Sequence, residues 1–210
     1  MINKNSKLFF LVLLGCFVST GAFGQTVTLL TQSENFADAQ GNVVPSGTLF
    51  GILVDTSGDG FFTNEYGPFS GGLNGNEYPD SSIALSDGTP TSNALVFVGT
   101  TGSNGYIGGA MDVRHSNGSG IAGTGDQWGI IWFPGITNGQ TPSSGDSYGF
   151  FTHDSLTIPP AGETAFYGDF IPQDIKTADY TIVPEPSVYA AAIGLGILIF
   201  VFVVRRRGNH

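Results

Sequence analysis

The sequence predicts an all-β fold: a single glycine-rich domain, built as a β-sandwich or a jelly-roll-like arrangement, between two apolar terminal segments. Short apolar and β-branched runs recur between clusters of Gly, Asn, Asp, Ser and Pro, which is the pattern of strands joined by turns. No stretch keeps a 3.6-residue apolar period over three turns. Of the 32 glycines, 26 lie in the 158 residues from 25 to 182, or about 16% where about 7% is usual.

Nine runs are candidate strands. They are Thr26–Thr31, Thr48–Val54, Ala94–Thr100, Tyr106–Val113, Trp128–Phe133, Ser147–Thr152, Ser155–Ile158, Thr164–Phe170 and Tyr180–Val183. Trp128–Phe133 is apolar on both faces and therefore predicts a central strand. Gly67–Asp80, rich in Gly, Asn and Pro, predicts a long surface loop. Ser33–Ala39 and Gln173–Ala178 could each form a short turn of helix.

The N-terminal 24 residues predict a secretory signal peptide. Two lysines precede the apolar run Leu8–Val18, and the segment ends in the small-x-small sequence Ala-Phe-Gly. Signal peptidase would cut after Gly24 and leave residues 25–182 as the exported β domain. An uncleaved anchor and a lipoprotein site at Cys16 are the alternatives. Because Cys16 is the only cysteine, the exported domain can form no internal disulfide.

The charge of the domain excludes several classes of partner. Between residues 25 and 182, Arg114 and Lys176 stand against sixteen Asp and Glu residues, which gives a net charge of −14. Phosphate contacts need Lys and Arg side chains, so the domain is not expected to bind nucleic acid or an anionic membrane surface.

The C-terminal segment, residues 183–210, combines a proline motif, an apolar helix and a basic cluster. It reads V-P-E-P-S, then an apolar run over residues 188–204, then three arginines. Seventeen helical residues reach about 26 Å, enough for a short transmembrane helix. The arginines would stay cytoplasmic by the positive-inside rule, which agrees with the lysines of the N-terminus.

This tail resembles the PEP-CTERM sorting signal of Gram-negative bacteria. The resemblance implies a single-pass intermediate in the inner membrane, recognition by an exosortase (a membrane-embedded cysteine protease), and release to the cell surface or extracellular matrix. It also implies an association with exopolysaccharide and biofilm. The implied recognition residues are Pro184, Glu185 and Pro186, and the implied cytoplasmic stop is Arg205, Arg206 and Arg207. The same tail is sometimes labelled an ice-binding protein C-terminal domain, a label that gives no evidence of ice binding. A plain one-span anchor is the alternative.

A candidate calcium loop follows one predicted strand. Asp55, Ser57 and Asp59 place oxygen side chains at relative positions 1, 3 and 5, and Gly60 occupies position 6, as at the start of a calcium-binding loop. Position 12 is Tyr66 rather than the required carboxylate. A turn closed by its own Asp and Gly residues is the alternative.

No catalytic constellation is predicted, so the protein is expected not to be an enzyme and to require no cofactor. His153, Asp154 and Ser155 have the residue types of a hydrolase triad, but neighbours on a strand point to alternating faces. Two functional hypotheses remain. One is a non-enzymatic, exported surface or matrix protein associated with exopolysaccharide. The other is a secreted carbohydrate-binding module stabilised by Ca²⁺, with sugar platforms among Tyr66, Tyr78, Tyr106 and Tyr148.

Overall fold

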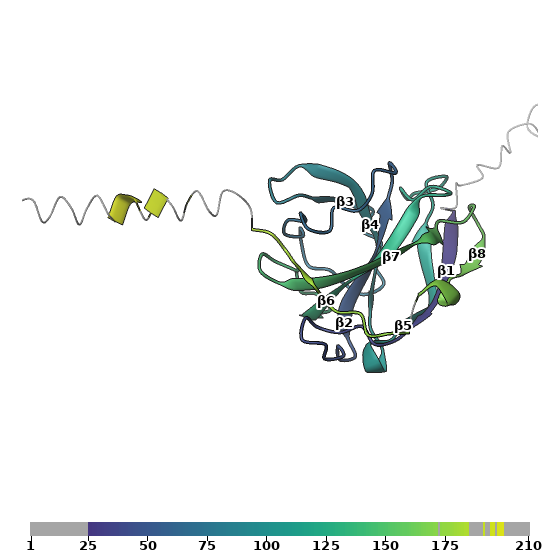
Figure 1. The fold of residues 1–210 in the computed structure, drawn as a ribbon. Coiled ribbons are helices and arrows are strands. Elements are labelled where there is room, and N and C mark those ends of the chain that lie inside the picture. The colour runs from purple at the N-terminus through teal and green to yellow at the C-terminus, as the bar shows by residue number, and fades with distance from the viewer. Residues whose placement is uncertain (1–24, 172, 185–190, 192–193, 196, 200–210) are drawn as a thin grey trace, which may run out of the picture.

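The computed structural model describes residues 25–171, 173–184, 191, 194–195 and 197–199, and it confirms the all-β prediction (Figure 1). Two short 3₁₀ turns accompany the strands in this part of the chain, η2 (Ser103–Gly105) and η3 (Gly168–Phe170). The strands are β1 (Thr26–Ser33), β2 (Thr48–Asp55), β3 (Ser81–Ala84), β4 (Pro90–Thr100), β5 (Ile107–Arg114), β6 (Gln127–Thr137), β7 (Ser147–Thr157), β8 (Thr164–Phe166) and β9 (Tyr180–Thr181).

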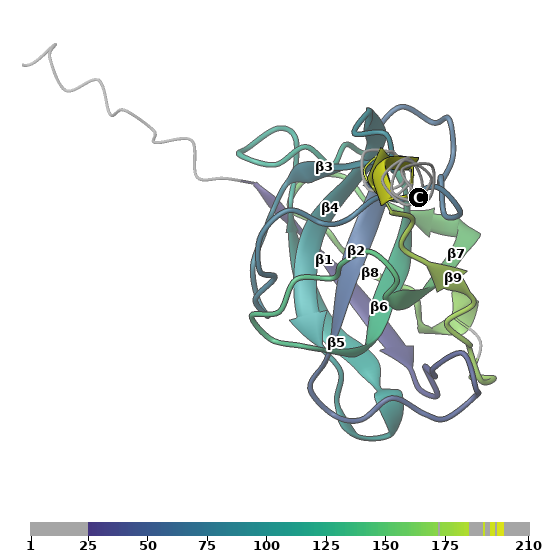
Figure 2. The ribbon, with the colours of Figure 1, turned by 90° about the vertical axis from the view of Figure 1, so that its left-hand side faces the viewer.

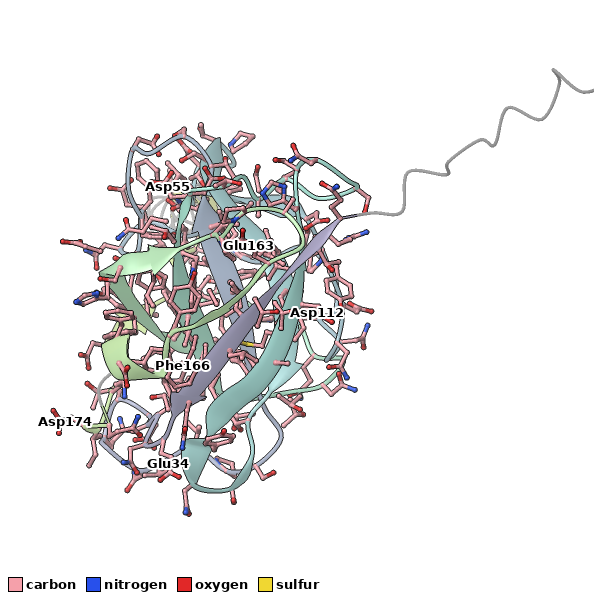
Figure 3. The ribbon with its side chains drawn as sticks, turned by 90° about the vertical axis from the view of Figure 1, so that its right-hand side faces the viewer. Glu34, Asp55, Asp112, Glu163, Phe166 and Asp174 are labelled. Carbon is pink, nitrogen blue, oxygen red and sulfur yellow. The ribbon has the colours of Figure 1, made fainter. Side chains whose placement is uncertain are left out.

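The strands form two sheets. The larger has the order β3-β4-β2-β6-β7-β9, and all its pairings are antiparallel. It is curled, as Figure 2 shows. The smaller has the order β5-β1-β8, with β5 antiparallel and β8 parallel to β1. Figure 3 shows this smaller sheet from the side on which Asp112 of β5 and Phe166 of β8 are exposed.

The central strands β2 and β6 are buried on both faces. Alternate β2 residues, such as Phe50 and Ile52, pack into the core between the two sheets, while Leu49 and Leu53 pack into a second core on the opposite face of the large sheet. Strand β6 divides in the same way, because successive side chains of a strand point to opposite faces. The expectation that Trp128–Phe133 is a central strand is confirmed.

The second core is covered by loops and by the end of the domain. Tyr66, Leu73 and Ile182 are buried there against the large sheet. The loop predicted for Gly67–Asp80 is irregular, but it is not wholly a surface loop, because Leu73 is 6% exposed and Glu77 forms a β-bridge with Val98. A sheet whose outer face is apolar needs such a cover.

Several boundaries differ from the sequence expectation. The two runs predicted within 147–158 form one strand, β7, and the run from Thr164 ends at Phe166, before the turn η3. Strand β3 has the weakly apolar sequence Ser-Ser-Ile-Ala and was not predicted. The helical turns expected at 33–39 and 173–178 are wrong. Neither segment is helical, and Phe36 forms a parallel β-bridge with Lys176 between them.

Glycines of the large sheet lie directly beneath aromatic rings. Trp132 of β6 is paired with Gly149 of β7, and a Cβ atom added at Gly149 would lie 1.9 Å from the Trp132 ring. Phe50 of β2 is likewise paired with Gly99 of β4, where an added Cβ would lie 2.6 Å from its ring. Each ring can therefore occupy its place over the neighbouring strand only because the paired residue carries no side chain.

This packing predicts a large cost for the smallest possible side chain at position 149. We expect Gly149→Ala to destabilise the domain by about 1–3 kcal/mol, because Trp132 is fully buried and has no room to move. Gly102→Ala is the matched control, since its φ of −79° suits any residue and its nearest neighbour lies at 3.4 Å. Chemical denaturation measures both. Equal stability of the two variants would show that the Trp132 ring is not confined.

Candidate functional site

The loop that follows β2 is organised by the carboxylate of Asp55. This side chain is buried, and its Oδ1 accepts hydrogen bonds from the backbone N–H groups of Ser57 (3.2 Å) and Gly58 (2.9 Å). Its Oδ2 accepts one from the N–H of Gly60 (2.7 Å). Three hydrogen bonds to one carboxylate close a tight turn and satisfy the backbone amides of the loop. The structure therefore shows the turn that the sequence offered as the alternative to a calcium loop.

The second carboxylate of the loop has a different environment. Asp59 is exposed, and its Oδ1 accepts a hydrogen bond from the Ser92 hydroxyl, which lowers the pKa of Asp59. Thr56 also donates to the Ser92 carbonyl, at 2.8 Å. Within the described part of the chain, no three or more His, Cys, Asp or Glu side chains are grouped to hold a metal. The calcium site stays a prediction.

Strand pairing brings one further titratable group, Asp126, close to Asp55, although the two residues are far apart in the sequence. Asp55 pairs with Gln127, which places Asp126 nearby. Burial raises the pKa of Asp126, the negative charge of Asp55 raises it further, and a hydrogen bond from Gly123 and the nearby His115 lower it. Only the strand register could therefore have indicated that Asp55 and Asp126 lie near each other.

The His115 ring is buried, and both of its nitrogen atoms form hydrogen bonds within the fold. Its Nδ1 accepts a hydrogen bond from the Asn117 N–H at 3.2 Å, which places the ring proton on Nε2, and Nε2 contacts Thr124 Oγ1 at 3.0 Å. In this tautomer the ring donates to Thr124 and does not accept its proton. The geometry is that of a structural histidine and not of a general base acting on Thr124.

The His153–Asp154–Ser155 sequence forms a local contact on β7. The backbone N–H of Ser155 donates to His153 Nδ1 at 3.1 Å, and the His153 ring stacks on Phe170 with a centroid distance of 5.7 Å. A hydrolase triad requires the serine hydroxyl to bond to the ring. The observed hydrogen bond joins the ring to the backbone of Ser155.

Two of the four candidate sugar platforms are wrong. Tyr66 and Tyr148 are fully buried in the second core. Tyr66 donates its hydroxyl to Asn93 Oδ1 at 2.6 Å, Tyr148 donates to the Thr63 carbonyl, and burial raises the pKa of both phenols. These hydrogen bonds join the covering loops to the large sheet. Tyr78 and Tyr106 are half-buried and present part of each side chain to solvent.

Both cations of residues 25–182 are engaged within the fold. Arg114 forms a 2.8 Å ion pair with Asp80, donates to the Tyr78 carbonyl, and lies 5.3 Å from the centre of the Tyr78 ring. Lys176 Nζ donates to the Asp174 carbonyl at 3.0 Å and lies over the Phe36 ring, and burial lowers its pKa. The exposed acidic side chains labelled in Figure 3 are spread over one face of the domain: Glu34, Asp112, Glu163 and Asp174.

The residues of the terminal signals lie mostly outside the described residues. These are 1–24, Glu185, Pro186, most of 188–204, and Arg205–Arg207, whereas Pro184 is described. The described residues of the tail from 191 onward are helical, and Leu195, Ile197, Leu198 and Ile199 are exposed. Among the residues that the structure covers, no helix is both long and apolar enough to span a membrane. Comparison of the chain with family models, curated proteins and solved structures gives no match.

The Arg114–Asp80 pair predicts a stability that depends on pH. Burial raises the pKa of Asp80, and Arg114 opposes this rise. In Arg114→Ala the carboxylate keeps its burial and loses its cation, so its folded-state pKa rises further. A raised pKa favours the protonated folded state at low pH, and that advantage is lost as the pH rises through the folded pKa. We therefore expect a loss of about 1–3 kcal/mol near pH 7 and a smaller one near pH 4.

Chemical denaturation at the two pH values measures this effect. The double variant Arg114→Ala/Asp80→Asn is the control, since a neutral amide in place of the carboxylate removes the unpaired buried charge. The control should be more stable than Arg114→Ala near pH 7. An equal loss at both pH values would contradict the electrostatic account.

Proposed function

We propose that this protein is an exported, exosortase-processed surface or extracellular-matrix protein, without enzymatic activity, that associates with exopolysaccharide. The observation that carries the proposal is the order of the C-terminal features: Pro184-Glu185-Pro186, an apolar run, and Arg205–Arg207 at the end of the sequence. The signal-peptide pattern of residues 1–24 supports the same direction of export. In this proposal the β domain crosses the inner membrane and the tail holds it there until the tail is cut.

The position of the motif relative to the fold is compatible with such a cut. Ile182 is fully buried in the second core, and the backbone N–H of Val183 donates to the Tyr66 carbonyl at 3.0 Å. These contacts lie immediately before Pro184. Cleavage at or after the motif would leave all of them in place, so the released domain would keep its C-terminal strand.

The electrostatics of the domain support a partner other than a polyanion. Arg114 and Lys176 are held by internal contacts, whereas Asp and Glu side chains are spread over the surface. A highly acidic protein repels nucleic acid and anionic lipid and stays soluble at the cell surface. An uncharged polysaccharide imposes no such repulsion.

The C-terminal mass of the protein recovered from its own host tests the sorting proposal. We expect the wild-type chain to end near Pro186, and the triple variant Pro184→Ala/Glu185→Ala/Pro186→Ala to retain the apolar tail and stay in the inner membrane. Ser187→Ala is the matched control, since it changes the next residue and leaves the motif intact. A full-length wild-type chain in the inner membrane would reduce the tail to a plain anchor.

The second candidate function is a secreted carbohydrate-binding module stabilised by calcium. Tyr106 favours it, because its half-buried side chain belongs to neither core. Tyr78 is half-buried as well, but it packs against the core between the sheets. The exposed Asp59 carboxylate, beside the turn closed by Asp55, is the group in the loop that a cation could still approach. In this candidate the ion stabilises the loop and takes no part in contacting the sugar.

The calcium hypothesis predicts a shift in melting temperature. Calcium at about 100 times its dissociation constant should stabilise the folded protein by about 2.7 kcal/mol, or roughly 5–10 °C for a domain of this size. Asp59→Asn should abolish the shift. Asp154→Asn, an exposed carboxylate on β7, should retain it. A melting temperature that does not change with calcium would contradict the calcium hypothesis.

A further inference from the structure

Two recesses meet at the side of the domain where the edge strand β5 approaches β4. The first, of about 320 Å³, lies between β5 and the adjacent strands β2 and β4, and the second, of about 430 Å³, lies beside it. Asn76 and Thr100 line both. Because they share these two residues, the recesses adjoin one another, and together they are called the β5 groove below.

The aromatic wall of the β5 groove is held in place by glycines. Tyr106 is half-buried, and its ring lies against Gly108, where an added Cβ would be 2.3 Å from the ring. The turn that carries Tyr106 is closed by a 2.8 Å hydrogen bond from the Gly102 N–H to the Tyr106 carbonyl. Phe50 and Phe97, nearly buried, line the groove beside it. A half-exposed ring fixed in this way is a rigid, flat apolar surface.

The polar side chains that line the groove have unused hydrogen-bonding capacity. Among the described residues, no side chain or backbone group bonds to the Asn76 amide or the Thr100 hydroxyl. Asn138 accepts the Gly75 N–H at 2.6 Å through its carbonyl oxygen, which leaves its NH₂ group available. Asn76 has a φ of +67°, and its backbone N–H donates to Val98 at 2.7 Å, so a strained backbone fixes the position of its side chain.

The groove contains no ionisable carboxylate or cation. Every residue that lines either recess is uncharged, in a domain with sixteen Asp and Glu residues. A charged ligand would find no counter-ion there. A complementary ligand would pack an apolar face on Tyr106. Its hydroxyl groups would form hydrogen bonds with Asn76, Thr100 and Asn138.

We propose that the β5 groove binds a neutral polysaccharide of hexopyranose units, with one ring stacked on Tyr106 and its neighbour along the chain hydrogen-bonded to Asn76 and Asn138. A pyranose has the required combination, because its axial C–H groups form an apolar face and its hydroxyls lie at the edge. The inference rests on the proposed association with exopolysaccharide. It adds that the protein binds the polysaccharide directly and that the binding site is this groove.

Affinity electrophoresis of the full-length chain tests the groove. The protein is held in a polyoxyethylene detergent, which has no sugar headgroup, and run through gels containing hydroxyethyl cellulose, laminarin or galactomannan. We expect at least one of these neutral polymers to retard the protein, with no loss of affinity at about 0.5 M NaCl, where ionic contacts are screened. Polygalacturonate, a polyanion, should not retard it.

Substitutions locate the binding. Tyr106→Ala should weaken affinity about tenfold or more, and Asn76→Gly, which keeps the backbone free to hold a positive φ, should weaken it about threefold to tenfold. Asn104→Gly is the matched control, since Asn104 also has a positive φ of 56° and lies outside the groove lining. Phe170→Ala is the control for an exposed ring elsewhere.

A second variant keeps the test decisive if Tyr106→Ala does not fold. Gly102→Leu places a side chain in the groove at a position whose backbone φ suits any residue, and it should block binding. Absence of retardation by all three neutral polymers, or affinity unchanged in both Asn76→Gly and Gly102→Leu, would overturn the proposal.

The C-terminal mass of the protein tests the sorting proposal independently of the groove. A processed chain that binds no neutral polymer refutes the groove alone, and an unprocessed chain that binds one refutes the sorting alone.

Discussion

The architecture depends on one constraint, which is that the large sheet is buried on both faces. Strands β2 and β6 supply apolar side chains to two cores at once. Large rings on one face of neighbouring strands would collide if the residue opposite each ring also carried a side chain. The pairs Trp132–Gly149 and Phe50–Gly99 resolve this conflict, because each places a ring over a bare backbone. Part of the high glycine content therefore follows from packing and not from loops.

The same constraint determines how the loops behave. A sheet with a second apolar face must be covered, and here irregular segments do the covering. Tyr66 and Tyr148 are buried beneath them and bond to Asn93 and to the Thr63 carbonyl. Arg114 and Lys176 act in a related way at the junctions between irregular segments, where each combines hydrogen bonding with an aromatic contact. The domain uses its only two cations to hold its connections in place and leaves its surface acidic.

The sequence predicted the features of the fold that depend on a local pattern of apolar residues. Long apolar runs such as Trp128–Phe133 were recognisable as strands, because double burial leaves no polar alternation to obscure them. Strand β3 was missed, since Ser81–Ala84 has one buried apolar residue and is defined by its pairing with β4. The buried tyrosines and the proximity of Asp126 to Asp55 also depend on strand register. The β5 groove escaped sequence analysis for that reason, although Tyr106 was named from its residue type.

The proposed tail and the proposed ligand site lie on different parts of this architecture. Ile182, the last buried residue before the Pro-Glu-Pro motif, packs into the second core, on the outer face of the large sheet. Phe50 and Phe97, which line the β5 groove, pack into the core between the sheets. A cut at the motif changes the chain next to the second core only. If both proposals hold, the domain binds polysaccharide equally well before and after release, so the groove can engage its ligand while the tail still holds the protein at the membrane.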